Sequence, residues 1–380
     1  MTVGLRDRIP AARFSERLDR AVAATETAGL GAMLVGVGSD LRYLTGYEAL
    51  PLERLTLLVV VPGASPWLLV PRLERDAAEA GVRARIDIRT WEELEDPYVM
   101  AVGAIPRSRR VAVSDDMAAR HVLPIQRALD STVACQLAST VMRDLRMIKD
   151  AEEIALLRAA AQAADRVVAR IARGRLVGRT EAEVAAEVRD RLIAEGHETA
   201  TFAIVASGPN SASPHHEASD RVIGAGEPIV LDIGGTLGGY GSDITRTLWV
   251  TGGNVTMPDA RFRELFDVLY DAQAAATDAV ASGVPCEDVD AAARRPIEAA
   301  GYGQAFFHRT GHGIGLDGHE DPYIVADNTL PLRTGMAFSV EPGIYLRGEY
   351  GARIEDIVVC GDDGPMVLNE APRELHVVAG

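Results

Sequence analysis

Two pairs of acidic residues, each split by a glycine-containing turn, constrain what this 380-residue chain can fold into more than any other feature. The first pair is Asp232 and Asp243, which lie equally far from the boundary between Leu237 and Gly238. Residues directly opposite each other in an antiparallel hairpin point to the same face. A turn centred at that boundary would therefore place the two carboxylates opposite one another, and we expect a β-hairpin there.

The second pair repeats this arrangement around Gly348. Glu341 and Glu355 are equidistant from that glycine, and alternating apolar residues flank them as in strands. Facing like charges destabilise a strand pair, and carboxylates within apolar strands are rarely buried without a partner. Four carboxylates that meet at one place therefore need cations to neutralise them.

One imidazole completes the expected set of ligands. His312 lies between the two acidic pairs, in the stretch HRTGHGIGLDGHEDP. Four carboxylates and one imidazole suit two adjacent divalent ions, so the sequence predicts a dinuclear metal site. Because the set is rich in oxygen, it favours hard ions; Mn²⁺ is the first expectation, and Co²⁺ or Zn²⁺ are alternatives.

Composition excludes several classes of function. The formal net charge of −16 argues against electrostatic binding to nucleic acid. No run approaches the ~18 consecutive apolar residues of a membrane span, and the charged N-terminus lacks the apolar core of a signal peptide. The three cysteines are far apart, which fits a reducing compartment without a disulfide framework. We therefore expect a soluble, cytoplasmic protein that binds neither nucleic acid nor membrane.

The length allows two domains with substantial cores. Residues 1–138 are predicted to form an α/β domain, because apolar strands alternate with helical segments, a pattern typical of a mostly parallel or mixed sheet. Residues 139–150 are expected to connect it to a second domain, residues 151–380. The strands of the first domain are expected at 32–37, 55–61, 67–70 and 110–113 and its helices at, for example, 15–29 and 72–80.

Helix signals organise the second domain. A long amphipathic helix with an acidic first turn follows Asp150, and a second starts at Thr180, where Glu183 completes a capping-box pattern. Further helices are expected at 258–282 and 286–300, between the two acidic hairpins.

The ordered motifs resemble a known family. The order Asp, Asp, His, Glu, Glu is similar to that of the creatinase/aminopeptidase-P/prolidase metallopeptidases of family M24, which have the pita-bread fold. The resemblance implies an α/β chain with a C-terminal pita-bread (creatinase/aminopeptidase-like) domain and a smaller N-terminal creatinase-type α/β domain. The motifs that carry it are SGPNSASPHH, LDIGGTLGGYGSDITRT, TGHGIGLDGHEDP, SVEPGIY and RIED, and, in the smaller domain, DLRYLTGY.

The resemblance implies a role for each predicted ligand. Asp232 would chelate one ion, and Asp243 and Glu355 would bridge both ions. His312 and Glu341 would bind the other ion, and Glu341 would also act as general base. A hydroxide that bridges the two ions would then attack a peptide carbonyl.

Further residues match the family's active site. His215, His308 and His319 match its histidines, and Arg353 matches an arginine that supports the site; packing alone could also explain His308, which lies four residues before the predicted ligand. His215 or His319 would stabilise the oxyanion or assist the leaving nitrogen. Contact with substrate is expected from His215, His319, Tyr323 and Arg353. No catalytic role is expected for His216, and His121, His197 and His376 are expected at the surface or in loops.

The expected substrate is a proline-containing di- or oligopeptide. An Xaa-Pro bond has no N–H and a fixed φ, so its hydrolysis needs a dedicated pocket. Many prolidases have an arginine after the proline of the His-Glu-x-Pro motif, where it can hold the carboxylate of a dipeptide, but this chain has Tyr323 there. Xaa-Pro dipeptidase is the first expectation and Xaa-Pro aminopeptidase (aminopeptidase P), acting on longer peptides, the second. A small-amide hydrolase of the same fold and a non-catalytic binding module are rivals. The family also suggests a homodimer.

Overall fold

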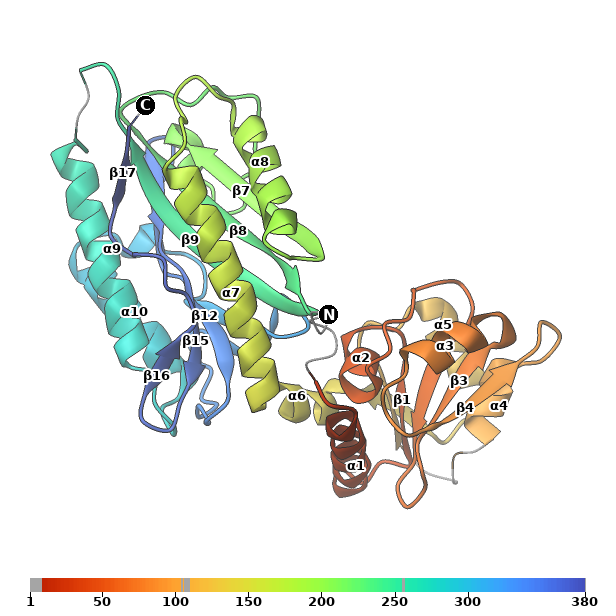
Figure 1. Cartoon of the computed structure of the whole chain (residues 1–380). Helices are drawn as coiled ribbons and strands as arrows, with labels where there is room; N and C mark the ends of the chain where they lie inside the picture. The colour runs from red at the N-terminus through yellow and green to blue at the C-terminus, as the bar shows by residue number, and fades with distance from the viewer. Residues whose placement is uncertain (1–8, 104, 106–109, 255–256, 380) are drawn as a thin grey trace. The chain divides into compact units, whose positions relative to one another are not determined.

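The computed structural model describes residues 9–103, 105, 110–254 and 257–379. The chain divides between Arg146 and Met147 into two compact units, which we describe separately (Figure 1). The predicted connection, residues 139–150, contains helix α6 (Ser139–Met147), so the boundary between the units falls at the end of a helix.

A six-stranded mixed sheet organises the N-terminal unit. Its order is β4-β3-β2-β1-β5-β6, with β2 antiparallel to both neighbours and the other pairs parallel, which confirms the predicted mixed sheet. The strands are β1 (Ala32–Val35), β2 (Leu57–Val60), β3 (Trp67–Pro71), β4 (Asp87–Trp91), β5 (Arg110–Val113) and β6 (Ala134–Leu137). The helices that precede α6 are α1 (Ala11–Thr27), α2 (Ser39–Thr45), α3 (Arg75–Gly81), α4 (Pro97–Gly103) and α5 (Ala119–Ala128).

The burial of each strand explains whether the apolar pattern of the sequence predicted it. The interior strands β1, β2 and β3 are buried along their whole length, so each is a run of apolar residues. The edge strands β4 and β6 are partly exposed and carry polar side chains, and the apolar pattern did not predict them.

Three sheets pack against four α-helices in the described part of the C-terminal unit. The helices are α7 (Ala151–Ala172), α8 (Glu181–Ala194), α9 (Ala260–Asp278) and α10 (Cys286–Ala299). One sheet has the order β17-β9-β8-β7, with β7 (Thr199–Ser207), β8 (Glu227–Leu237), β9 (Tyr240–Val250) and β17 (His376–Val378). A second has the order β11-β10-β12-β15-β16, with β10 (Gly311–Gly313), β11 (Glu320–Ile324), β12 (Ala337–Val340), β15 (Asp356–Cys360) and β16 (Pro365–Val367). The third is the pair β13 (Gly343–Leu346) and β14 (Tyr350–Arg353).

The helices lie outside these sheets. Helices α7 and α8 cover the sheet that contains β8 and β9, and α9 and α10 lie side by side (Figure 1). Asp150 and Thr180 cap α7 and α8 with reciprocal hydrogen bonds to the residue three positions on, which confirms the capping box predicted at Thr180. A helix with the length and apolar character needed to cross a membrane does not occur among the described residues.

The first acidic hairpin differs in register from the prediction. Leu237 pairs with Tyr240, so the turn is the two residues Gly238 and Gly239, one position later than expected. Both have positive φ, 62° and 87°, which glycine adopts without strain and which a two-residue hairpin turn requires. Asp232 therefore pairs with Thr245 and not with Asp243. The two aspartates are diagonal neighbours on the same face of the sheet.

The second acidic hairpin keeps the predicted register across two ladders. Gly343 pairs with Arg353 in the β13–β14 ladder, and Val340 pairs with Asp356 in the β12–β15 ladder. Both ladders are centred on residue 348, so Glu341 and Glu355 lie opposite each other in the gap between them.

A buried arginine connects the two acidic hairpins. Arg246, on β9, is 1 % exposed and its Nη2 lies 2.6 Å from Asp356 Oδ1, which is equally buried. Arg246 Nη1 donates to the carbonyl oxygen of Glu355 at 2.6 Å, and its Nε donates to that of Pro372. This side chain fixes the position of β9 relative to the segment that carries Glu355.

Replacing Arg246 with leucine should lower the free energy of unfolding by about 3 kcal/mol, because the Asp356 carboxylate loses its buried counter-charge. Gln273 still donates to Asp356 at 3.1 Å, which places the cost at the lower end of the range for such pairs. Urea unfolding followed by circular dichroism measures the effect. The same change at the exposed Arg295, on α10, is the control; equal losses in both variants would contradict this account.

Candidate metal centre

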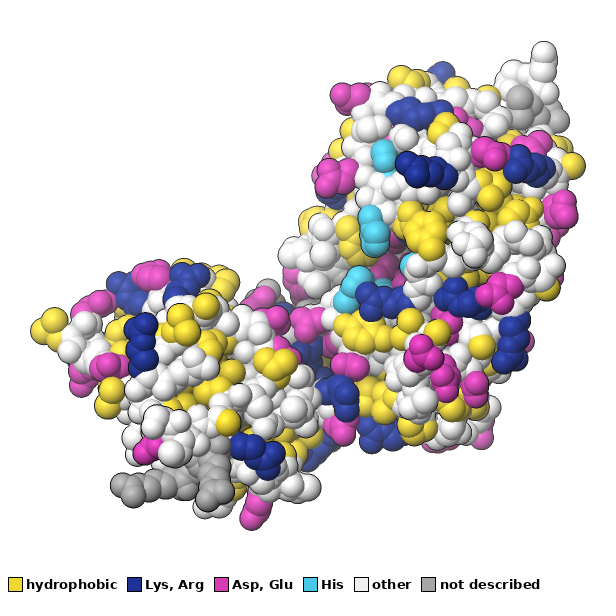
Figure 2. All heavy atoms as spheres, turned by 180° about the vertical axis from the view of Figure 1, so that it is seen from behind, with side chains coloured by type: hydrophobic (Ala, Val, Ile, Leu, Met, Phe, Trp, Pro, Cys, Tyr) yellow, Lys and Arg dark blue, Asp and Glu magenta, His cyan; other side chains and the backbone are white. Residues whose placement is uncertain are grey.

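All five predicted ligands line one cavity of about 300 Å³ in the C-terminal unit. Asp232 lies on β8, Asp243 on β9 and His312 on β10, while Glu341 directly follows β12 and Glu355 directly precedes β15. Figure 2 shows histidine side chains of this unit gathered on one face, with acidic side chains between them. The other predicted site residues that line the cavity are His215, His308, His319 and Arg353.

A cluster of one imidazole and two carboxylates forms the centre of the cavity. The ligand atoms of Asp243, His312 and Glu355 lie within 4.8 Å of one another. His312 Nε2 lies 3.7 Å from Asp243 Oδ2 and 3.3 Å from Glu341 Oε1. His312 Nδ1 lies 3.1 Å from the carbonyl oxygen of Gly313 and donates to it, so Nε2 presents its lone pair to the carboxylates.

The two glycines beside His312 allow this packing. A Cβ on Gly311 would lie 1.8 Å from the carbonyl oxygen of Ser339, and a Cβ on Gly313 would lie 2.3 Å from that of Asp321. Only glycine therefore lets β11 and β12 approach β10 closely enough to hold the imidazole inside the cavity.

A hydrogen-bond network connects the outer ligand, Asp232, to the central cluster. Arg353 Nη2 donates to Asp232 Oδ2 at 2.5 Å, its Nη1 donates to the Tyr345 hydroxyl at 2.7 Å, and its Nε donates to Thr245 Oγ1 at 3.1 Å. Thr245 Oγ1 in turn donates to Glu355 Oε2 at 2.7 Å. These contacts fix one oxygen of Asp232 and one of Glu355.

The remaining oxygens of these two carboxylates fit a metal. Among the described residues, Asp232 Oδ1 and Glu355 Oε1 are buried without a hydrogen-bond partner. A buried acceptor left unpaired is costly, and few occur in native proteins. A divalent cation in the cavity would satisfy both oxygens, so the donor set fits the predicted ions.

The protein groups alone repel one another strongly. Burial, followed by the charge of Asp232, raises the pKa of Asp243 well above its ordinary value. Burial and the charge of Asp243 do the same to the pKa of Glu355, and burial raises the pKa of Glu341 to about 7. Cations that neutralise these carboxylates would relieve the repulsion.

Burial keeps three histidines of the cavity, His308, His312 and His319, neutral near pH 7. Burial lowers the pKa of His312 to about 3 and that of His308 to about 4, and it lowers the pKa of His319 as well. His308 Nε2 lies 3.0 Å from the Tyr345 hydroxyl, and the rings of His312 and His319 have centroids 3.9 Å apart. Neutral imidazoles can ligate a metal or donate one hydrogen bond to a substrate.

Sequence reasoning missed two charged residues near this cavity. Arg309 lines it, whereas Tyr323, which was predicted to contact substrate, is not a lining residue and instead lies beneath the Arg309 guanidinium, 4.5 Å from it. Glu181, the first residue of α8, is fully buried behind the loop that carries His215. In the sequence, Thr180 and Glu183 predict the start of this helix, and Glu181 was assigned no role.

Glu181 holds that loop through several hydrogen bonds. Its carboxylate accepts from the backbone N–H groups and hydroxyls of Ser207 and Ser219 at 2.6–3.1 Å and from the Asn210 amide. His216 Nε2 lies 2.8 Å from Glu181 Oε2, so His216 has a structural role. Burial alone would raise the pKa of Glu181, but these hydrogen bonds outweigh it and hold the pKa at about 2.

His197 lies in the loop between α8 and β7, in line with the expectation of a surface or loop position, but its side chain is only 3 % exposed. Its Nε2 lies 2.8 Å from Ser242 Oγ, next in sequence to Asp243. It packs behind the metal ligands and not in the cavity.

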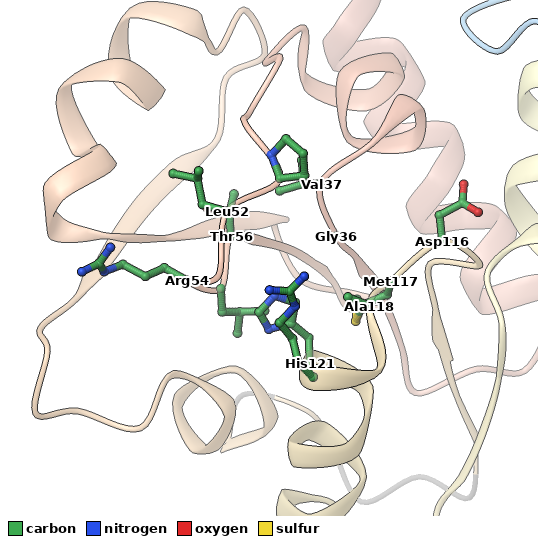
Figure 3. A pocket seen from close by; sticks show the side chains of 12 residues that line it. Gly36, Val37, Leu52, Arg54, Thr56, Asp116, Met117, Ala118 and His121 are labelled. Atoms are coloured by element: carbon green, nitrogen blue, oxygen red, sulfur yellow. The ribbon is translucent and has the colours of Figure 1, made fainter.

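The N-terminal unit contains a smaller cavity, of about 80 Å³ (Figure 3). Its side chains come mostly from apolar residues such as Leu52 and Met117, and Asp116 is the one carboxylate among its described lining residues. His121 also lines it, and its Nδ1 lies 3.0 Å from the Tyr98 hydroxyl. This cavity lacks a set of converging ligands, so the metal chemistry belongs to the C-terminal unit.

Known families match both units. Residues 155–362 match metallopeptidase family M24, and residues 17–148 match the creatinase/prolidase N-terminal domain. These matches confirm the predicted fold class, in which a creatinase-type domain precedes a pita-bread domain.

Individual relatives match over nearly the whole chain. The probable dipeptidase PepE of Mycobacterium tuberculosis is 47 % identical over 377 residues, which cover 98 % of this chain and 98 % of that protein. The Xaa-Pro dipeptidase of Pyrococcus horikoshii is 30 % identical over 367 residues, which cover 95 % of this chain and 99 % of that protein. The crystal structure of dipeptidase PepE from Mycobacterium ulcerans matches with a TM-score of 0.91 at 45 % identity, covering 98 % of this chain and 100 % of that one.

Replacing Asp243 with asparagine should prevent the binding of two ions per chain, because the amide removes one negative charge from the centre of the cluster. Metal content after dialysis, measured by plasma mass spectrometry, tests this. Asp271→Asn, at an exposed position on α9, is the matched control and should load as the unmodified protein does. Two ions retained by Asp243→Asn would show that the ligand assignment is wrong.

Replacing Glu181 with glutamine should lower the free energy of unfolding by about 3 kcal/mol near pH 7, because a pKa of about 2 against an ordinary 4.5 stabilises the folded state. A depressed carboxylate pKa contributes its full stability above the unfolded value. The difference between Glu181→Gln and the unmodified protein should therefore be constant above pH 5 and shrink as pH falls from 4.5 towards 2. Urea unfolding at several pH values measures it, and a difference independent of pH would contradict the role given to this carboxylate.

Proposed function

Because the chain belongs to metallopeptidase family M24, we propose that it is a dinuclear metal-dependent dipeptidase that hydrolyses the bond before proline in Xaa-Pro dipeptides. The observation that carries the proposal is the convergence of four carboxylates and one imidazole, from five separate segments, on one cavity. Two relatives in the family, a probable dipeptidase and an Xaa-Pro dipeptidase, support the choice of substrate.

The resemblance to the family supplies the ligand roles, and the positions of the side chains support them. Asp232 would hold one ion through the oxygen that Arg353 leaves without a partner. His312 and Glu341 would hold the second ion, and Asp243 and Glu355 would be shared by the two ions. The oxygen-rich set favours Mn²⁺, with Co²⁺ or Zn²⁺ as alternatives. When bound, the ions would polarise the scissile carbonyl and make the attacking water more acidic.

The protein groups would move the protons. Glu341, whose Oε1 accepts a hydrogen bond from Ser339 Oγ at 3.1 Å, would accept a proton from the attacking water. His319 and His215 would donate hydrogen bonds to the oxyanion or to the leaving nitrogen, which in an Xaa-Pro bond has no hydrogen of its own. His308 would act through Tyr345, which also receives a hydrogen bond from Arg353.

The cavity also offers an apolar wall for a proline ring. Phe202 and Ile204, on β7, and Pro214, next to His215, line the cavity beside the ligands. Ile204 pairs with Asp232 in the β7–β8 ladder, so this wall adjoins the metal ligands. An apolar surface close to a few converging polar groups is typical of a site that binds a small substrate.

An assay on synthetic peptides tests the function. The protein loaded with Mn²⁺ should hydrolyse Ala-Pro and Gly-Pro, and a chelator should abolish the activity because the carboxylates alone cannot polarise the carbonyl. Release of the N-terminal amino acid measures the rate, and Asp271→Asn serves as the active control. Faster cleavage of Xaa-Pro-Xaa tripeptides would indicate an aminopeptidase. Cleavage of small cyclic amidines alone would indicate an amidohydrolase, and purification without stoichiometric metal would indicate a binding module.

A further inference from the structure

One cation in the cavity, Arg309, has neither an ion-pair nor a hydrogen-bond partner for its guanidinium among the residues that the structure describes. Arg309 is partly buried and lines the cavity together with the predicted ligands. Across the described ranges of the chain, its guanidinium makes no ion pair and no hydrogen bond. Arg353, the other arginine of the cavity, donates hydrogen bonds to Asp232, Tyr345 and Thr245. Arg309 is thus the arginine of this cavity whose donors remain available to a ligand.

An aromatic ring holds Arg309 in place. Its guanidinium carbon lies over the Tyr323 ring, 4.5 Å from the centroid. Tyr323 pairs with His312 in the β10–β11 ladder, and opposite residues in such a ladder point to the same face. The Arg309–Tyr323 pair therefore lies on the face of the sheet that presents the imidazole of His312. Stacking of this kind orients the plane of a guanidinium without using its hydrogen-bond donors.

The charge of the cavity favours an anionic ligand. Two divalent ions would balance the four carboxylates, and one guanidinium, that of Arg353, directly contacts Asp232. The charges of both guanidinium groups would then be in excess until an anionic ligand binds, and that of Arg309 would have no carboxylate in contact with it. A planar guanidinium binds a carboxylate with two parallel hydrogen bonds, which makes a carboxylate its best-matched small partner.

We propose that Arg309, oriented by Tyr323, binds the C-terminal carboxylate of the substrate and so selects dipeptides over longer peptides. The inference rests on the proposed function, since it names the part of the substrate that this cavity recognises. In a tripeptide the carboxylate lies one residue further from the scissile bond, about 3.5 Å away along an extended chain. A guanidinium fixed by stacking cannot follow it, so its contribution to binding is specific for a dipeptide.

The experiment compares alanyl-proline with alanyl-prolinamide, in which a neutral carboxamide replaces the C-terminal carboxylate. The unmodified protein should favour alanyl-proline. Arg309→Gln should raise the KM for alanyl-proline about 10- to 100-fold with a smaller change in kcat, because it removes a charge-assisted hydrogen-bonded pair. The KM for alanyl-prolinamide should be the same in both proteins. Arg309→Lys should recover only part of the affinity, because lysine keeps the charge without the planar donors.

Two further measurements separate recognition from structural damage. Metal content should be unchanged in Arg309→Gln, and calorimetry should show weaker binding of proline, but not of prolinamide, to the metal-loaded variant. Tyr323→Leu should show the same selective rise in KM, whereas Arg295→Gln, at an exposed site, should match the unmodified protein. An equal loss on both substrates in Arg309→Gln would overturn the inference and leave the dipeptidase function standing. Failure of the unmodified, metal-loaded protein to cleave either compound would instead overturn the proposed function itself.

Discussion

Repulsion among four converging carboxylates, three of them buried, is the interaction on which the C-terminal unit depends. In a cavity of low polarity such groups cannot all stay ionised without cations, and the raised pKa values of Asp243 and Glu355 express that conflict. The surrounding protein provides directed donors, from Arg353 to Asp232 and from Thr245 to Glu355, but leaves one oxygen of each carboxylate unpaired. The fold thus fixes the orientation of the ligands, and the neutralising charge must come from bound ions.

The sequence was enough to predict which acids converge, but not how the first hairpin pairs. Two acidic residues at equal distances from a point predict a turn at that point only if the residues there can adopt the backbone conformation of a turn. At the second pair, Gly348 is central, and the register was correct. At the first, Gly238 and Gly239 both need positive φ, which moves the centre one residue on. This changes the partner of Asp232 by two residues, and since side chains alternate with a period of two, Asp232 stays on the predicted face. The predicted convergence of the ligands was therefore correct although the predicted register of the first hairpin was wrong.

Residues whose partners are distant in sequence could not be predicted. Glu181 carries a strong local signal as an early acidic residue of a helix, and that signal hides its contacts with residues 26 to 38 positions later. The edge strands β4 and β6 were not predicted for a related reason, because a partly exposed strand lacks the apolar run that marks an interior strand. In both cases the structure is determined by contacts between residues that are distant in sequence, and a local sequence pattern does not reveal such contacts.

The two arginines of the cavity explain how recognition can vary while the metal ligands stay the same. Arg353 is buried and makes contact with Asp232, so any change there would disturb the ligands. Arg309 is joined to the rest of the protein through an aromatic ring on β11, and that strand contributes no metal ligand. A substitution at Arg309 or Tyr323 would alter the binding of substrate without moving a carboxylate. If Arg309 binds the substrate as proposed, specificity depends on a residue pair whose side chains contact none of the predicted metal ligands, all of which the structure describes, through an ion pair or a hydrogen bond.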